Sequence, residues 1–297
     1  MKQLNFLKSY AKPNLPIARE RFPVILFSPG AGTNIQEYEN LIMQLVSHGY
    51  IVIGINSVFI SGNFHLPNGT LVPKPNYSAS ELFHQVYSEQ LNDLEFVYQK
   101  LNFQNENDPI FTAMDLKHIG TLGHSAGGLA VVDAAHQHPN WFQAVSTLDE
   151  GLDSVPDVLE KYYSPVTGPI LYLYAAEGHA VITKYLHTPL LVTDNAFSAV
   201  ITPSLTNQTY SVHNNFTDYS TLQYQPLINK AIAYAKKTGQ APVGDGDGYD
   251  IANSITAYLL AFFDFYLKSN GVGANPFSGC IPLAKNTVLI CGPNVNS

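Results

Sequence analysis

Short apolar runs alternate along this chain with stretches in which apolar residues recur every three or four positions. An apolar run bounded by turn residues is typical of a buried strand, and the wider spacing is typical of a helix with one buried face. We therefore expect strands at residues 22–28, 50–55, 117–122, 143–148 and 169–175. By the same reasoning we expect helices at residues 38–46, 86–101, 126–136, 226–237 and 251–268.

The alternation of strands and helices indicates a mostly parallel sheet covered by helices on both faces. No repeat or change of composition divides the chain, so we expect a single α/β domain over residues 1–297, with its core at 21–270 and a C-terminal tail at 271–297. The helix at 251–268 is apolar nearly all round, which is typical of a core helix; the alternative is a dimer or lipid-facing surface. Residues 56–80 have no period and predict a long loop.

One motif lies between an expected strand and an expected helix: Gly123-His124-Ser125-Ala126-Gly127. This is the nucleophile-elbow pattern of the α/β-hydrolase fold, in which a strained turn raises the serine above the sheet edge. The small residues on either side let neighbouring backbone come close. The alternative is a glycine-rich turn with an incidental serine, but the flanking elements favour the elbow.

A nucleophilic serine needs an imidazole that takes its proton. Three histidines, His179, His187 and His213, lie after or near the last expected strands. His213 follows a β-prone run, Tyr210 to Val212, and we expect it at the end of a strand, from which it would reach over the serine.

The imidazole in turn needs a carboxylate that fixes its tautomer. Asp149, Glu177 and Asp194 are the candidates. Most members of this fold take the acid from the position that Glu177 represents, so spacing alone leaves Asp149 and Glu177 as alternatives. The glycine-rich loop at 29–33 follows a strand, and such a loop holds the second oxyanion-hole N–H in this fold.

Four segments, residues 24–32, 45–52, 123–128 and 212–219, resemble those of the platelet-activating-factor acetylhydrolases. These are serine esterases of the α/β-hydrolase superfamily. The resemblance implies Ser125 as nucleophile, His213 as base and Asp149 as acid, because the family takes its acid from the strand that follows the elbow. It also implies that the backbone N–H groups of Ala31 and Ala126 form the oxyanion hole. Residues 178–198 read as an insertion relative to the family.

The composition of the chain bears on its partners and on the compartment in which it works. The net charge is −8 and no basic run occurs, which argues against nucleic acid as a partner. Charged residues make up only 13% of the chain, which suits a secreted enzyme. Cys280 and Cys291 flank two short apolar arms around a Lys-Asn turn, so we expect a hairpin stapled by a disulfide, with two free thiols as the alternative.

No apolar run is long enough for a membrane helix. Residues 1–16 lack the apolar core of a signal peptide, so a secreted or periplasmic form would have lost its signal. The histidines and cysteines lack the spacing of a metal site. The acidic stretch at 245–250 lacks the later glutamate of a calcium loop, and we interpret it as a polar turn and helix cap.

The predicted function is hydrolysis of a small-molecule or lipid ester through an acyl-enzyme, with no cofactor. A phospholipase, a lysophospholipase or a deacylase of the platelet-activating-factor type is the alternative among enzymes. A non-catalytic binding module is the alternative outside them. Aromatic residues are candidates for an acyl pocket, with ordinary packing as the alternative for each: Tyr38, Phe59, Phe64, Trp141 and Phe197.

Overall fold

The computed structural model describes residues 11–58, 60–73, 79–101, 108–150, 166–177, 196–204, 206–222, 229–230, 232–234 and 243–290. A seven-stranded sheet in the order β2-β1-β5-β6-β7-β8-β9 forms its centre. The strands are β1 (Phe22–Ser28), β2 (Ile51–Gly54), β5 (Met114–His124), β6 (Ala144–Leu148), β7 (Ile170–Ala175), β8 (Ala196–Ile201) and β9 (Val288–Ile290). Neighbouring strands are parallel, except that β9 runs antiparallel to β8.

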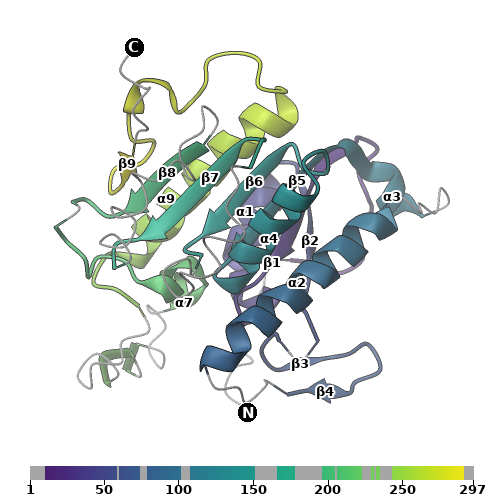
Figure 1. Cartoon of the computed structure of the whole chain (residues 1–297), viewed down its shortest axis with the longest axis horizontal. Coiled ribbons are helices and arrows are strands. Elements are labelled where there is room, and N and C mark those ends of the chain that lie inside the picture. The colour runs from purple at the N-terminus through teal and green to yellow at the C-terminus, as the bar shows by residue number, and fades with distance from the viewer. Residues whose placement is uncertain are drawn as a thin grey trace.

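Helices cover both faces of this sheet (Figure 1). Helices α2 (Ala79–Leu101) and α4 (Ala126–Gln137) lie on one face, and α1 (Glu39–Ser47) and α9 (Gly248–Phe263) lie on the other. Strands β6 and β7 are buried along their whole length, which explains why they read as continuous apolar runs rather than alternating ones. The shorter elements are η1 (Ile35–Tyr38), α3 (Pro109–Ala113), η3 (His213–Phe216), α7 (Tyr219–Leu222), η4 (Asp264–Lys268) and η5 (Ser278–Cys280).

Most of the predicted elements are present. All of the predicted strands occur, and the helices at 38–46, 86–101, 126–136 and 251–268 occur with shifted ends. The core interpretation of the last helix is confirmed, because α9 packs Ile255, Phe262 and other apolar residues into the core under the sheet. Its cap is also confirmed: the Asp247 carboxylate accepts the backbone N–H groups of Tyr249 and Asp250. The predicted helix at 226–237 lies mostly outside the described residues.

Three expectations differ from the structure. Residues 196–198, the end of the predicted insertion, belong to the core strand β8, whose Ser and Ala residues weaken its apolar signal. The predicted hairpin around residues 285–286 is wrong, because β9 pairs with β8 instead of with residues 281–284. The loop at 56–80 contains a two-stranded antiparallel sheet made of β3 (Phe64–His65) and β4 (Leu71–Val72).

Two further expectations concern the compartment. Cys291 lies outside the described residues, so the disulfide with Cys280 stays a prediction. In the described part of the chain, no helix combines the length and the apolar character that crossing a membrane requires.

Candidate active site

Ser125 lies in the sharp turn between β5 and α4. Its φ of 55° and ψ of −125° place a non-glycine residue in a conformation that sterics disfavour. A Cβ on Gly123 would lie 2.2 Å from the carbonyl oxygen of Gly127, and one on Gly127 would lie 2.3 Å from the carbonyl oxygen of Ser28. Backbone therefore touches backbone on both sides of the turn, and this contact is the steric reason for the glycines at these positions.

The hydrogen-bond ladder of the sheet continues past the ends of β5 and β6. The N–H of Ser125 donates to the carbonyl of Leu148 at 3.0 Å, and the N–H of Asp149 donates to the carbonyl of Leu173 at 2.7 Å. Ser125 and Asp149 are each the first residue after their strand. The register of two neighbouring parallel strands therefore fixes both residues at the same edge of the sheet.

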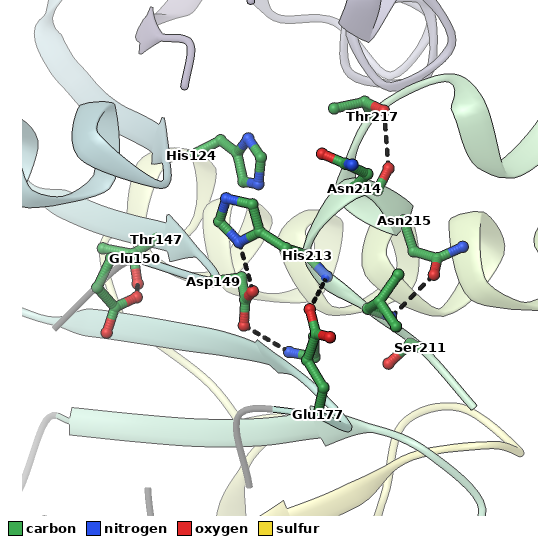
Figure 2. Close-up of polar contacts among 12 residues, drawn as sticks. His124, Thr147, Asp149, Glu150, Glu177, Ser211, His213, Asn214, Asn215 and Thr217 are labelled. Carbon is green, nitrogen blue, oxygen red and sulfur yellow. Dashed lines mark hydrogen bonds and ion pairs between the residues drawn. The ribbon is translucent and has the colours of Figure 1, made fainter. Parts of the chain in front are cut away.

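Asp149 binds the ring of His213. Its Oδ2 lies 2.6 Å from His213 Nδ1, and its Oδ1 accepts the N–H of Ala175 at 2.8 Å (Figure 2). The Asp149 side chain is 12% exposed, whereas the His213 side chain is 38% exposed. The shielded carboxylate therefore orients the imidazole, while the ring remains accessible from outside.

His213 does not follow a strand, contrary to the sequence-based expectation. Residues 210–212 form no strand, and His213 is instead the first residue of the short helix η3, beyond the loop that follows β8. Ser211 anchors this loop, because its hydroxyl accepts the N–H of Ala176 at 2.9 Å and donates to the carbonyl of Ile201 at 2.5 Å. The buried side chain of Ser211 thus positions the His213 segment, which was expected to be positioned by a strand.

Glu177, the alternative acid, also contacts His213, but at its main chain. Its Oε1 accepts the backbone N–H of His213 at 2.5 Å (Figure 2). The geometry therefore favours Asp149 as the partner of the imidazole. The other candidates for acid and base, Asp194, His179 and His187, lie outside the described residues.

The loop after β1 forms a tight turn over Gly30–Thr33, in which Gly32 has a φ of 73°. The N–H groups of Gly30, Gly32 and Thr33 bond to acceptors, which are Tyr38 Oη at 3.1 Å, the Ile60 carbonyl at 2.9 Å and the Gly30 carbonyl at 3.1 Å, respectively. Among the described residues nothing accepts the N–H of Ala31. Within the described part of the chain, it is thus the one N–H of this turn that is free to bind a substrate oxygen.

This turn lies directly against the elbow. A Cβ on Gly30 would lie 3.3 Å from the Cβ of Ser125. Ala126 is the first residue of α4, so its N–H has no acceptor within the helix. The positions predicted to supply the two oxyanion donors, Ala31 and Ala126, therefore flank Ser125 on adjoining segments.

No role was predicted for His124, and its partner Tyr38 was predicted only as a candidate for an acyl pocket or as ordinary packing. His124 is buried, its Nδ1 lies 2.7 Å from Tyr38 Oη, and its ring centroid lies 4.5 Å from that of His213 (Figure 2). Burial lowers the pKa of His124 well below its usual value, the nearby His213 lowers it further, and the His213 backbone partly offsets both effects. His124 therefore stays neutral and does not oppose a positive charge on His213.

Glu150 follows Asp149 but lies in a different environment. Its carboxyl is buried and accepts the hydroxyl of Thr147 (Figure 2). The Tyr174 hydroxyl is its second side-chain partner. Burial raises the pKa of Glu150 to about 8. At neutral pH this carboxyl is therefore mostly protonated.

Two of the aromatic candidates for an acyl pocket, Trp141 and Phe197, stack on other aromatic rings, and Phe59 lies outside the described residues. The ring of Trp141 stacks between those of Tyr98 and His138, with centroids 4.0 and 3.7 Å away. Phe197 stacks on Phe277 at 4.6 Å. These residues therefore fit the packing alternative.

The chain was compared with family models, with curated protein sequences and with solved structures. No family model matches the chain, and no curated protein sequence matches it either. Among solved structures, the chain is similar to a ferulic acid esterase from Streptomyces cinnamoneus, with a TM-score of 0.73 and 18% sequence identity. The similarity covers 92% of this chain and 75% of that chain.

The narrower resemblance to the platelet-activating-factor acetylhydrolases finds no support in these comparisons and stays a prediction. Sheet order, helix layers and this structural likeness agree, and the chain has the α/β-hydrolase fold.

Proposed function

We propose that this protein hydrolyses carboxylic esters, with Ser125 as nucleophile, His213 as general base and Asp149 as the acid that orients the base. The observation that carries this proposal is the 2.6 Å contact between His213 Nδ1 and Asp149 Oδ2 beside the strained elbow of Ser125. The alternative acid, Glu177, binds the main chain of His213 instead of its ring.

The chemistry follows from this arrangement. Asp149 holds the Nδ1 proton of His213, which leaves Nε2 as the basic nitrogen. Nε2 takes the proton of Ser125 as the serine oxygen attacks the ester carbonyl, and the alcohol leaves with that proton. The same imidazole then deprotonates a water molecule that attacks the acyl-enzyme, and it returns this proton to the Ser125 oxygen as the acyl–oxygen bond breaks and the carboxylic acid product leaves.

The negative charge of each tetrahedral intermediate needs donors that are already in place. The N–H groups of Ala31 and Ala126 supply them in this proposal, because the first has no acceptor in the described part of the chain and the second begins a helix. The loss of one such donor typically lowers kcat by on the order of 10²–10³.

The substrate belongs to the small-molecule or lipid esters. One structural neighbour is a ferulic acid esterase by name, which adds aromatic esters to the candidate substrates. A phospholipase or lysophospholipase is the alternative among enzymes, motivated by the resemblance to the acetylhydrolases. A non-catalytic module is disfavoured, because such a module needs neither a strained serine nor an oriented imidazole.

The test is hydrolysis of p-nitrophenyl esters from acetate to palmitate, of methyl ferulate and of a lysophospholipid, with Ser125→Ala as the control. Fluorophosphonate labelling reports the nucleophile independently of the substrate. We expect labelling at Ser125 and turnover of at least one ester that the variant lacks. An unlabelled wild-type protein without turnover would refute the proposal and leave the binding module.

A further inference from the structure

The Tyr38 hydroxyl is buried and is surrounded by polar groups. It accepts the N–H of Gly30 at 3.1 Å, and it lies 3.0 Å from Thr33 Oγ and 2.7 Å from His124 Nδ1. Tyr38 has no exposed surface. A phenol has one proton to donate and two lone pairs to accept with, so these three partners use its full capacity. A burial of this kind is stable only when the partners stay in place.

These partners belong to two segments that adjoin Ser125. Gly30 and Thr33 begin and end the turn that carries Ala31, while His124 immediately precedes Ser125. Tyr38 itself is the last residue of η1 and is buried. One hydroxyl therefore ties the oxyanion turn to the elbow. Because it binds the N–H of Gly30, it also fixes the direction in which the next N–H, that of Ala31, points.

His124 extends this connection to the loop of the base. Its ring lies 4.5 Å from the ring of His213 and 6.1 Å from that of Phe216, between centroids. His213 and Phe216 are the first and last residues of η3. The His124 ring therefore packs against both ends of the helix that carries the base.

The geometry points to Tyr38 and His124 as positioning residues, which form a buried polar bridge between the oxyanion turn, the elbow and η3. This inference rests on the proposed function, since the turn binds an oxyanion only if Ser125 attacks a carbonyl. The bridge acts through other groups: Tyr38 sets the position of the Ala31 N–H, and His124 sets the distance between Ser125 and His213.

Tyr258 provides a matched control. It is also fully buried, and its hydroxyl likewise accepts a backbone N–H, that of Leu283 at 3.2 Å, and contacts a threonine, Thr287 Oγ at 3.0 Å. These partners lie in the C-terminal segment, outside the turn, the elbow and η3. Tyr258→Phe thus removes a hydroxyl with the same kind of hydrogen bonds but no connection to Ser125.

The experiment compares Tyr38→Phe with Tyr258→Phe, with melting temperature measured for both. For Tyr38→Phe we expect a kcat about 10–100-fold lower and a KM within about 3-fold, because a misplaced donor weakens chiefly the transition state. Binding of a boronic acid, which mimics the tetrahedral state, should weaken by the factor lost in kcat/KM. Tyr258→Phe should lower the melting temperature to a similar extent and leave kcat within about 2-fold of the wild-type value. The lost hydrogen bonds lie outside the active site, so they affect stability and not catalysis.

A second variant tests whether the two residues act as one unit. His124→Phe keeps a ring and removes both nitrogens, so the double variant Tyr38→Phe/His124→Phe should lose no more activity than the worse single variant. Fully additive losses would overturn the bridge. So would a Tyr38→Phe variant with the same kcat as Tyr258→Phe.

The proposed function is tested separately, by wild-type turnover and labelling of Ser125, which involve no change at Tyr38. A crystal structure of Tyr38→Phe then tests the bridge without any activity. A displaced Gly30–Thr33 turn supports it, and a turn that superposes on that of the wild-type protein overturns it.

Discussion

Two carboxylates hold His213 from two sides, and they hold different parts of it. Asp149, after β6, binds the ring through Nδ1 at 2.6 Å, whereas Glu177, after β7, binds the backbone N–H at 2.5 Å. Both follow neighbouring parallel strands, so both reach the same edge of the sheet. The difference separates two tasks, since one carboxylate sets the tautomer of the imidazole and the other fixes the segment that carries it.

The surroundings of the Asp149 and Glu177 carboxylates agree with these two different tasks. Asp149 is nearly buried, and its second oxygen is occupied by the N–H of Ala175, so its orientation toward the ring is fixed. Glu177 is exposed, and its bond to a main-chain donor is open to water. A charge acts more strongly where water is excluded, so the ring side of His213 should matter far more for turnover than the main-chain side.

The largest expected effect comes from Asp149→Asn. The amide oxygen of the new side chain would accept the N–H of Ala175, which turns its NH₂ group toward His213 Nδ1. The imidazole must then accept at Nδ1 and carry its proton at Nε2, the wrong tautomer for taking the proton of Ser125. We expect kcat to fall by about 10⁴-fold with little change in KM, as measured on the best ester.

The chain contains a second Asp–His pair that serves as the control. Asp115 Oδ2 lies 2.6 Å from His118 Nδ1, near the start of β5 and thus far along the strand from Ser125. Asp115→Asn makes the same chemical change and should leave kcat unaltered. Equal losses in the two variants would show that the effect of Asp149→Asn is one of folding and not of the tautomer.

A smaller effect is expected on the main-chain side. Glu177→Ala removes the acceptor of the His213 N–H and should lower kcat by about 10-fold, the size of one charged hydrogen bond at a partly exposed site. Glu177→Gln keeps an acceptor oxygen and should stay within about 3-fold of wild type by the same reasoning. A Glu177→Gln loss that exceeds that of Asp149→Asn would exchange the roles of the two carboxylates.

The two carboxylates also show which parts of the site could be predicted from the sequence. The apolar runs and the elbow motif predicted the parallel sheet and the place of Ser125, because both depend on local pattern. Spacing left Asp149 and Glu177 as alternatives, because both follow a strand and the choice depends on which atom of His213 each one reaches. That atom is decided by the loop after β8, and neither β8 nor η3 was predicted.

The contact between Tyr38 and His124 could not be predicted from the sequence, for a related reason. Its helical spacing indicates packing, and the structure confirms that it is buried. Its hydroxyl, however, meets His124 from a position far away in the sequence. A single sequence carries no signal for such a contact, since the same tyrosine would satisfy the helical pattern with its hydroxyl bonded elsewhere.

Of the three carboxyls Asp149, Glu177 and Glu150, we expect Glu150 to matter least for turnover. Because burial raises the pKa of Glu150 to about 8, the folded protein keeps a proton that the unfolded chain loses near pH 4.5. Stability should therefore fall as pH rises from about 4.5 to 8, since the folded state binds more protons over that range.

Glu150→Gln should retain kcat within about 3-fold and should flatten this slope, by on the order of a few kcal/mol across the range. Urea unfolding of both proteins at pH 5 and pH 8.5 measures the change. Parallel slopes for the two proteins would contradict this prediction, because they would show that Glu150 is ionised in the folded protein.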